Sequence, residues 1–193
     1  LYRDIDALRA QGAVIAGDPG VGYQLRAGFM LPPMMFSPDE LEALVLGARW
    51  VASHADPELA EAAGRALDRV VGVLPEGLRL QVETSGLFAP DWSPVPPEPW
   101  LPALRRAIRE GNAVRLRYRD AQGRASERLV WPFAMAFLAD MRLLAAWCES
   151  RADFRHFRAD RVLALEDTGR RYPEQRQRLV RRWERQRLRR TGD

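Results

Sequence analysis

The sequence of 193 residues contains no lysine, one cysteine and two histidines. Without lysine, Schiff-base and lysine general-base chemistry are excluded, and all thirty cations are arginine. Because Cys148 is the only cysteine, an intramolecular disulfide is excluded. Its apolar surroundings beside Trp147 favour a position in the core over a role as a nucleophile. His54 and His156 stand alone, without metal-ligand spacing, and no serine has a nucleophile-elbow context. We therefore predict no enzymatic activity, no metal and no cofactor.

Long hydrophobic runs are also absent. The longest apolar runs fall well short of the ~18–20 residues that a membrane span needs. No basic segment followed by an apolar stretch opens the chain, so no secretion signal is recognisable. We expect a cytoplasmic protein with no membrane partner, and the lone cysteine fits a reducing compartment. Because Leu1 stands inside a helical pattern, we also expect a preceding N-terminal piece.

What is abundant is arginine at the C-terminal end. Residues 174–193 carry eight Arg against three carboxylates, a net charge of +5, while the total for the chain is +4. The rest of the chain therefore sums to −1, and the basic total alone does not indicate nucleic acid binding. Two interpretations stay open for this segment: a solvated helical tail, or a helix that contacts phosphates.

The N-terminal residues 1–10 have apolar side chains at helical spacing, with Gly12 just beyond them. Two short apolar runs, 13–16 and 23–25, then flank a glycine-rich turn, which predicts a hairpin. A helix followed by a hairpin is the order found at the end of a winged helix, although any α/β protein can contain it. In a winged helix the DNA-facing residues would be Tyr2, Arg3, Asp6, Gly20, Gly22 and Tyr23. A dinucleotide loop is rejected because a third glycine and a following helix are missing.

The middle of the chain predicts two antiparallel helices and a connector. Ser37 and Glu40 form a capping box around Pro38, followed by one apolar stripe. A second helix begins at Asp56-Pro57-Glu58 and is predicted to run to Pro75. Its predicted buried face consists of Leu59, Ala63, Ala66, Val70 and Leu74. Residues 84–99 contain five prolines and form the predicted domain boundary.

After a short helix that Gly111 ends, the hydrophobic period changes from helical to two. Five short alternating runs follow within about seventy residues, separated by turns. The runs are Val114–Tyr118, Arg128–Phe133, Met141–Cys148, Phe154–Arg158 and Val162–Leu165. We predict an α+β fold whose C-terminal half is a small, strongly bent antiparallel β-barrel, because small sheets avoid open edges by closing.

Two stretches resemble a known family of bacterial regulators. Leu1–Leu8 with the glycine-rich Asp18–Leu25 is similar to the recognition helix and wing of DeoR/YafY-type regulators. Trp131–Glu149 and Phe154-Arg155-His156-Phe157-Arg158-Ala159-Asp160-Arg161 resemble the WYL domain of the same proteins. Two departures stand out: the Trp-Tyr-Leu signature is Arg142-Leu143-Leu144 here, and the first helices of the winged helix are absent.

The resemblance implies a partial winged helix (1–30), a helical linker or dimerisation region (31–83), the connector (84–99), a Sm/SH3-like WYL barrel (100–170) and an Arg-rich helix (171–193). It also implies a basic barrel surface that binds an anionic effector, a nucleotide or single-stranded nucleic acid. Cations on both faces of residues 153–162 cannot all be buried, so some must lie at a rim. The predicted effector-binding residues are Tyr118, Arg128, Arg142, Arg155, His156, Phe157, Arg158 and Arg161. Of these, Arg128, Arg142, Arg155 and Arg158 are expected to converge with the Tyr118 and Phe157 rings at the open mouth of the barrel.

The sequence thus predicts a homodimeric transcriptional regulator that binds a duplex DNA operator and responds to the effector. Arginine forks with stacking rings are suited to phosphates and unpaired bases. The competing interpretation pairs Arg155 or Arg161 with Asp153 or Asp160, which would only fasten the strand end. A second functional hypothesis is a module that binds single-stranded nucleic acid without regulating a promoter.

Overall fold

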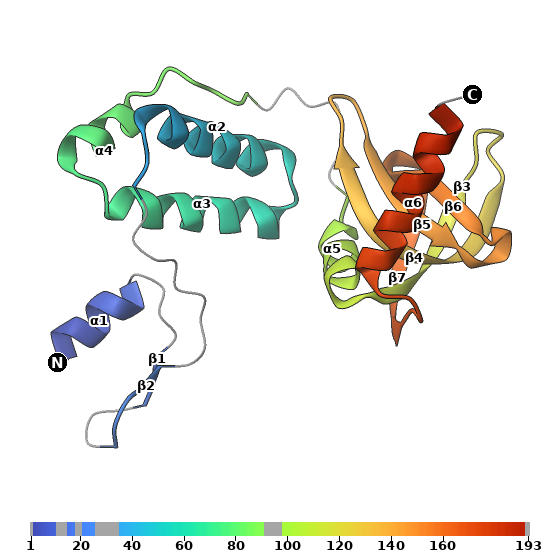
Figure 1. Ribbon diagram of the computed structural model, residues 1–193, viewed down its shortest axis with the longest axis horizontal. Coiled ribbons are helices and arrows are strands. Elements are labelled where there is room, and N and C mark those ends of the chain that lie inside the picture. The colour runs from blue at the N-terminus through green and yellow to red at the C-terminus, as the bar shows by residue number, and fades with distance from the viewer. Residues whose placement is uncertain (1, 11–14, 18–20, 26–34, 91–97, 192–193) are drawn as a thin grey trace. The chain divides into compact units, whose positions relative to one another are not determined.

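The computed structural model describes residues 2–10, 15–17, 21–25, 35–90 and 98–191. Figure 1 shows a chain of mixed helices and strands that divides into two compact units, residues 1–90 and 91–193. The division lies within the proline-rich segment that the sequence marks as a connector. No helix among the described residues combines the length and apolarity that crossing a membrane requires.

The N-terminal unit begins with helix α1 (Tyr2–Ala10) and a two-stranded hairpin, β1 (Ile15–Ala16) and β2 (Gln24–Leu25). Gly17 follows β1 with a φ of +116°, and a Cβ there would lie 2.0 Å from the carbonyl oxygen of Gly22. Only glycine permits this close approach of the two sides of the hairpin. The predicted order of helix and hairpin is confirmed, although a complete winged helix is not seen.

Three helices follow in the same unit: α2 (Pro38–His54), α3 (Pro57–Gly72) and α4 (Glu76–Glu83). The predicted capping box is present, since Ser37 N donates to Glu40 at 2.8 Å and Glu40 N donates to Ser37 Oγ at 3.3 Å. Asp56 caps α3 by accepting from the Leu59 N–H at 3.2 Å. The small core consists of Leu41 and Val45 of α2 with Val82 of α4.

Two predictions for this region were wrong. Helix α3 ends at Gly72, and the separate helix α4, which the sequence analysis missed, follows Pro75. No residue of α3 is fully buried, and Ala66 of its predicted buried face is exposed. The amphipathic pattern of α3 therefore leaves apolar surface that this unit only partly covers.

The C-terminal unit is built on one five-stranded antiparallel sheet with the strand order β6-β5-β4-β3-β7. Helix α5 (Leu101–Glu110) precedes it and ends at Gly111, which has a φ of +76°, as predicted. The other elements are β3 (Asn112–Arg119), β4 (Ala125–Phe137), β5 (Arg142–Cys148), the 3₁₀ turn η1 (Glu149–Arg151), β6 (Asp153–Arg158), the 3₁₀ turn η2 (Ala159–Arg161), β7 (Val162–Arg171) and α6 (Arg176–Thr191).

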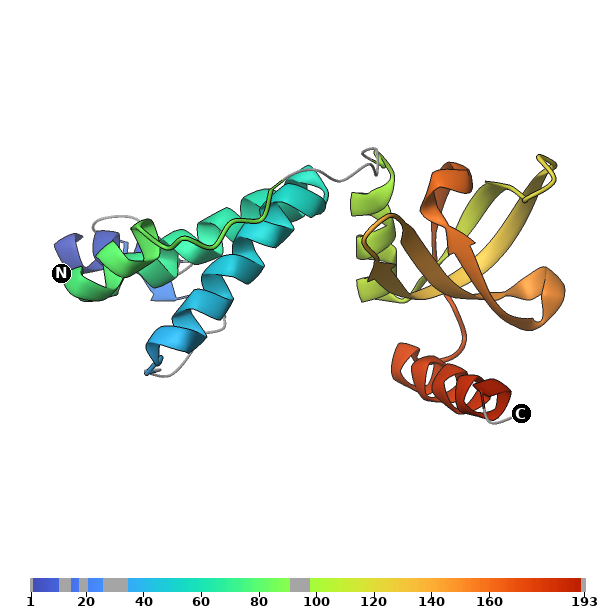
Figure 2. The same cartoon turned by 90° about the horizontal axis from the view of Figure 1, so that it is seen from above.

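Both faces of the sheet are covered, and the residues alternate between two cores. Val130, Leu144 and Cys148 pack with α5 residues in one core. Trp131 and Trp147 pack with Leu179 of α6 in the other. Successive side chains of a strand point to opposite faces, so the two cores lie on opposite sides of the sheet. Figure 2 shows α5 and α6 on different sides of the strands.

Closure of the sheet into a barrel is not seen. Strands β6 and β7 are the two edges, and no ladder joins them among the described residues, although only the three residues of η2 separate them. The ladder between β4 and β5 has a register shift between Pro132 and Ala134 of β4. Proline cannot donate to a ladder and is tolerated at such bulges, which bend the strand.

Candidate functional site

The structure brings three of the eight predicted effector residues into one cluster at the end of β6. The Tyr118 ring meets Phe157 edge-on, with the ring centroids 5.1 Å apart, and the Tyr118 hydroxyl accepts from the Arg158 N–H at 3.3 Å. The Arg158 guanidinium donates to both oxygens of Asp160, at 3.0 and 2.9 Å. These bonds hold the pKa of Asp160 below its usual range. The cluster is therefore already neutralised by its own carboxylate.

Arg142 does not lie at an exposed rim, contrary to the prediction. Its side chain is 8% exposed and forms an ion pair of 2.5 Å with Glu98, which is 6% exposed. The guanidinium also lies 5.6 Å from the centroid of the Phe137 ring. Burial raises the pKa of Glu98, and the charge of Arg142 offsets only part of that rise. This ion pair thus links Glu98, which precedes α5, to the first residue of strand β5.

The remaining four residues are dispersed. The Arg155 guanidinium lies 3.5 Å from the Asp153 carboxylate, with half of the arginine side chain exposed. The His156 ring contacts the Trp183 ring of α6, with the ring centroids 5.9 Å apart. Arg128 stands opposite Leu116 in the ladder of β3 and β4, and Arg161 belongs to η2, where its charge lowers the pKa of Asp160. The predicted convergence of Arg128, Arg142, Arg155 and Arg158 on one open mouth is not seen. A role for these residues in binding an effector stays a prediction.

In the N-terminal unit, the predicted DNA-facing side chains Tyr2, Arg3 and Asp6 are exposed on α1. Tyr2 contacts Tyr23 of the hairpin edge-on at 6.2 Å. Gly22 has a φ of +108°, in keeping with a turn position, and Gly20 lies outside the described residues. The helix and hairpin are therefore brought together at Tyr2 and Tyr23, and contact with DNA stays a prediction.

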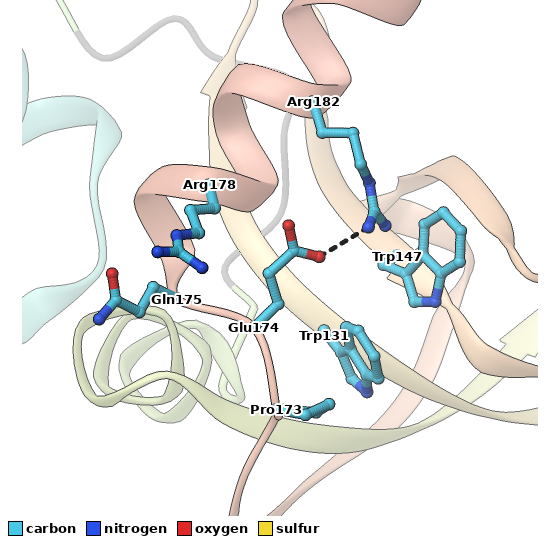
Figure 3. Close-up of a pocket in the computed structure, with 7 residues that line it drawn as sticks. All are labelled: Trp131, Trp147, Pro173, Glu174, Gln175, Arg178 and Arg182. Atoms are coloured by element: carbon cyan, nitrogen blue, oxygen red, sulfur yellow. Dashed lines mark hydrogen bonds and ion pairs between the residues drawn. The ribbon is translucent and has the colours of Figure 1, made fainter.

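A pocket of about 520 Å³ lies between α6 and the sheet of the C-terminal unit. None of the eight predicted effector residues is among those that line it. The lining residues are Trp131, Trp147, Pro173, Glu174, Gln175, Arg178 and Arg182 (Figure 3). Its walls thus combine two indole rings from the sheet with two guanidinium groups from the helix. Guanidinium groups bind phosphates and carboxylates, and indole rings stack on planar groups.

The two indoles are positioned by the sheet itself. Trp131 of β4 and Trp147 of β5 are direct partners in the ladder, with ring centroids 6.2 Å apart. Trp131 is fixed further by stacking on Tyr172 at 5.8 Å and by donating its Nε1–H to Glu149 at 2.7 Å. Their orientations are therefore set before any ligand arrives.

Arg182 has two kinds of contact in the pocket. Its guanidinium lies 4.3 Å from the Trp147 centroid and 5.1 Å from that of Phe154. Its Nη1 donates to Glu174 at 2.7 Å, as Figure 3 shows, while its buried Nη2 has no acceptor in the described part of the chain. Arg178 lies one helical turn earlier and is exposed.

Helix α6 holds the arginines over the indoles because its other side is anchored. Leu179 is fully buried, and Trp183 packs on Phe133 at 5.6 Å between centroids. Two polar contacts add to this: Arg176 donates to the Phe133 carbonyl at 3.3 Å, and Gln186 donates to Asp153 at 2.9 Å. The helix is thus a packed part of the unit and not a free tail.

This pocket was not predicted from the sequence. Two signals were available: Trp131 and Trp147 lie at facing positions of adjacent strands, and Glu174, Arg178 and Arg182 recur every four residues. What joined them was the folding of α6 onto the sheet, which periodicity alone does not give. Among the described residues, no three His, Cys, Asp or Glu side chains gather as metal ligands.

Comparison with known proteins finds a family match in the C-terminal unit. The family model for the WYL domain matches residues 99–167, from the turn before α5 to strand β7. The solved structure of proteasome accessory factor B/C (PafBC) of Arthrobacter aurescens is 32% identical over 72% of this chain, with a TM-score of 0.39. The match covers 21% of that protein, so the chain spans about a fifth of its length. Helix α6 lies beyond the residues that the WYL family model matches.

Proposed function

We propose that this WYL-domain chain is part of a bacterial transcriptional regulator whose C-terminal unit binds an anionic effector. Residues 1–30 would form the end of a winged helix that contacts a duplex operator, and the effector would alter the affinity of that contact. The bent sheet, with β6 and β7 left unpaired, would be a variant of the Sm/SH3-like barrel. The proposal keeps the effector class expected from the sequence, a nucleotide or single-stranded nucleic acid.

The observation that carries the proposal is the distribution of charge between the two units. Residues 91–193 contain 23 Arg against 14 carboxylates, a net charge of +9, whereas residues 1–90 have a net charge of −5. The unit that contains the WYL domain therefore attracts anions, and a field of this sign raises their local concentration and their rate of association. An effector that binds there is expected to be anionic.

The DNA-binding half of the proposal rests on α1 and its hairpin. Recognition helices of this class lie in the major groove with a wing beside them. Tyr2, Arg3 and Asp6 are exposed on α1, and Tyr2 contacts the hairpin at Tyr23. This arrangement fits a recognition helix with an adjoining wing.

Dimerisation through the middle helices completes the proposal. The apolar side of α3 is only partly covered, and Leu44 and Leu80 of the neighbouring helices are exposed. A second copy of the chain would cover this surface. A dimer would present two α1 helices to two half-sites of an operator, and an effector can act by favouring one arrangement of them.

The alternative, a single-strand-binding module without a promoter, draws support from the same arginine excess. A salt titration separates the two functions. Binding to single strands through phosphates weakens along a steep log–log slope for any sequence, whereas a regulator retains a large preference for one duplex.

The experiment is a selection from fragments of genomic DNA, with fluorescence anisotropy on the selected and scrambled duplexes at 50 and 200 mM salt. We expect at least one duplex to bind about 10³-fold more tightly than its scrambled control, and a nucleotide or oligonucleotide to change that affinity. Equal affinity for all duplexes, together with tight binding of any single strand, would favour the alternative.

A further inference from the structure

We propose that the pocket between α6 and the sheet is the effector site, and that it binds a planar aromatic ring carrying a phosphate. The inference rests on the proposed function and assigns it a location and a ligand chemistry. The pocket is separate from the Arg158–Asp160 cluster, and its helical wall lies beyond the residues that the WYL family model matches. Its volume of about 520 Å³ falls in the range of about 300–1,000 Å³ typical of small-molecule sites.

The aromatic part of the ligand is indicated by the floor of the pocket. Trp131 and Trp147 are adjacent across the ladder, tilted by 32° to each other, and both line the cavity. Indole rings bind flat π systems by stacking, in a way that tolerates different bases. Because Tyr172 and Glu149 already fix Trp131, little side-chain freedom is lost when a ring binds.

The anionic part is indicated by Arg182. This guanidinium lies against two aromatic rings, and its buried Nη2 has no acceptor among the described residues. A buried donor without an acceptor is costly, and a cationic one more so, unless an oxygen atom reaches it. A phosphate group offers several acceptor oxygens and would satisfy both nitrogens of the fork.

Glu174 occupies the position beside Arg182 that the anionic group of the ligand would take. Its carboxylate accepts from Arg182 Nη1 at 2.7 Å and lines the same pocket (Figure 3). A phosphate that reaches Arg182 would meet this carboxylate as a like charge and replace it. Glu174 therefore lowers the affinity of the pocket for anions: its carboxylate neutralises Arg182 when no ligand is bound, and it competes with weakly bound anions for that guanidinium.

Arg178 supplies the second cation. It lies one helical turn before Arg182 on the wall of the pocket, is exposed, and forms none of the described ion pairs. Its planar fork can reach the same phosphate from the open side. Because a sugar or an uncharged ring carries no charge for two guanidinium groups to bind, the two arginines favour a ligand with a phosphate.

A nucleoside 5′-monophosphate and the 5′-phosphorylated end of a strand share this chemistry. The probes are therefore adenosine 5′-monophosphate, adenosine, inorganic phosphate, and a five-nucleotide DNA with and without its 5′-phosphate. Isothermal titration gives affinity, and quenching of tryptophan fluorescence reports stacking. We expect a phosphorylated probe to bind at least about tenfold more tightly than its unphosphorylated partner, with quenching. If the monophosphate meets this expectation, the source is a free nucleotide, and if only the phosphorylated strand does, the source is a strand end.

Four variants locate the site. Arg178→Ala should weaken binding about tenfold, as loss of a charge-assisted contact does. Arg181→Ala is the matched control: it removes the same charge from the same helix, but residue 181 does not line the pocket, so affinity should stay within about twofold. Glu174→Gln removes the competing charge and should tighten binding about threefold or more. The double variant Arg155→Ala/Arg158→Ala should bind normally.

The outcomes separate this inference from the proposed function. If the double variant loses binding while Arg178→Ala and Arg181→Ala behave alike, the pocket assignment is wrong and an anionic effector still binds elsewhere in the unit. If none of the phosphorylated probes binds the unchanged chain, both the pocket and the nucleotide effector are rejected. If Glu174→Gln binds no more tightly than the unchanged chain, displacement of this carboxylate is rejected.

Discussion

Removing one partner of the buried Glu98–Arg142 pair should destabilise the C-terminal unit strongly. The two side chains are 6% and 8% exposed, so Arg142→Met leaves a carboxylate almost fully removed from water. Breaking such a pair costs about 3–5 kcal/mol because the remaining charge is uncompensated. The matched control is Arg115→Met on the same sheet, where the arginine is 52% exposed beside Glu127 and Glu166. Exposed ion pairs contribute about 1 kcal/mol or less, so the unfolding free energy of Arg115→Met should stay close to that of the unchanged chain.

Urea unfolding followed by tryptophan fluorescence measures both effects. The double variant Glu98→Leu/Arg142→Met should recover most of the lost stability, because apolar replacement of a buried pair is often neutral. The cost of Arg142→Met alone should also shrink as the pH falls from 7 toward 5. Burial raises the pKa of Glu98 in the folded state, so this group favours unfolding at high pH and less so at low pH. A cost below about 1 kcal/mol for Arg142→Met, equal to that of the control, would refute a structural role for the pair.

Three further predictions follow from the described contacts. Leu179→Ala empties a fully buried position beneath α6 and should cost about 2–5 kcal/mol of unfolding free energy in urea titrations; no loss would mean that α6 is not packed on the sheet. Ser37→Ala removes the hydroxyl that accepts from the Glu40 N–H and should cost about 1 kcal/mol, seen as faster hydrogen exchange in the first turn of α2; unchanged exchange would contradict the cap. Arg158 lowers the pKa of Asp160, so the stability from this carboxylate is present above about pH 4 and lost as the pH falls. Asp160→Asn should therefore flatten the loss of stability on acidification, and an unchanged pH profile would show that the pair contributes nothing.

Local signals predicted the elements well where the deciding contacts lie close in sequence. The start of α2 followed from Ser37 and Glu40, and the end of α5 from Gly111. The alternation of apolar and charged residues placed β3 correctly, and the apolar run of β5, which is buried on both faces, placed that strand. Helix α4 was missed because it has eight residues, follows Pro75 and has no side-chain cap.

Long-range contacts limited the prediction of the site. The sequence groups Arg142 with the effector-binding arginines, because its partner Glu98 lies 44 residues earlier and local patterns do not reveal the pair. Arg155, in contrast, pairs with Asp153 two residues earlier, as the competing interpretation of a strand-end ion pair expected. Asp160 forms its ion pair with Arg158, which that interpretation did not name.

The pocket also depends on contacts between residues that are distant in sequence. From sequence alone, the arginine-rich end of the chain can be either a solvated tail or a helix that contacts phosphates. Leu179 and Trp183 anchor α6 on the sheet and so bring Arg178 and Arg182 to Trp131 and Trp147. The few apolar residues of this helix stand among eight arginines in sixteen residues, so their periodicity is too weak to predict the docking from sequence.

The central claim is that one chain couples an anionic ligand in its WYL-domain unit to the reading of duplex DNA. The direct measurement is the dissociation constant of the selected duplex with and without saturating phosphorylated probe, for the unchanged chain and for Arg178→Ala. We predict a change of at least about fivefold in the unchanged chain, and a much smaller one in the variant at the same probe concentration. Identical duplex affinities with and without a bound probe would contradict the claim, because a ligand without differential affinity cannot regulate.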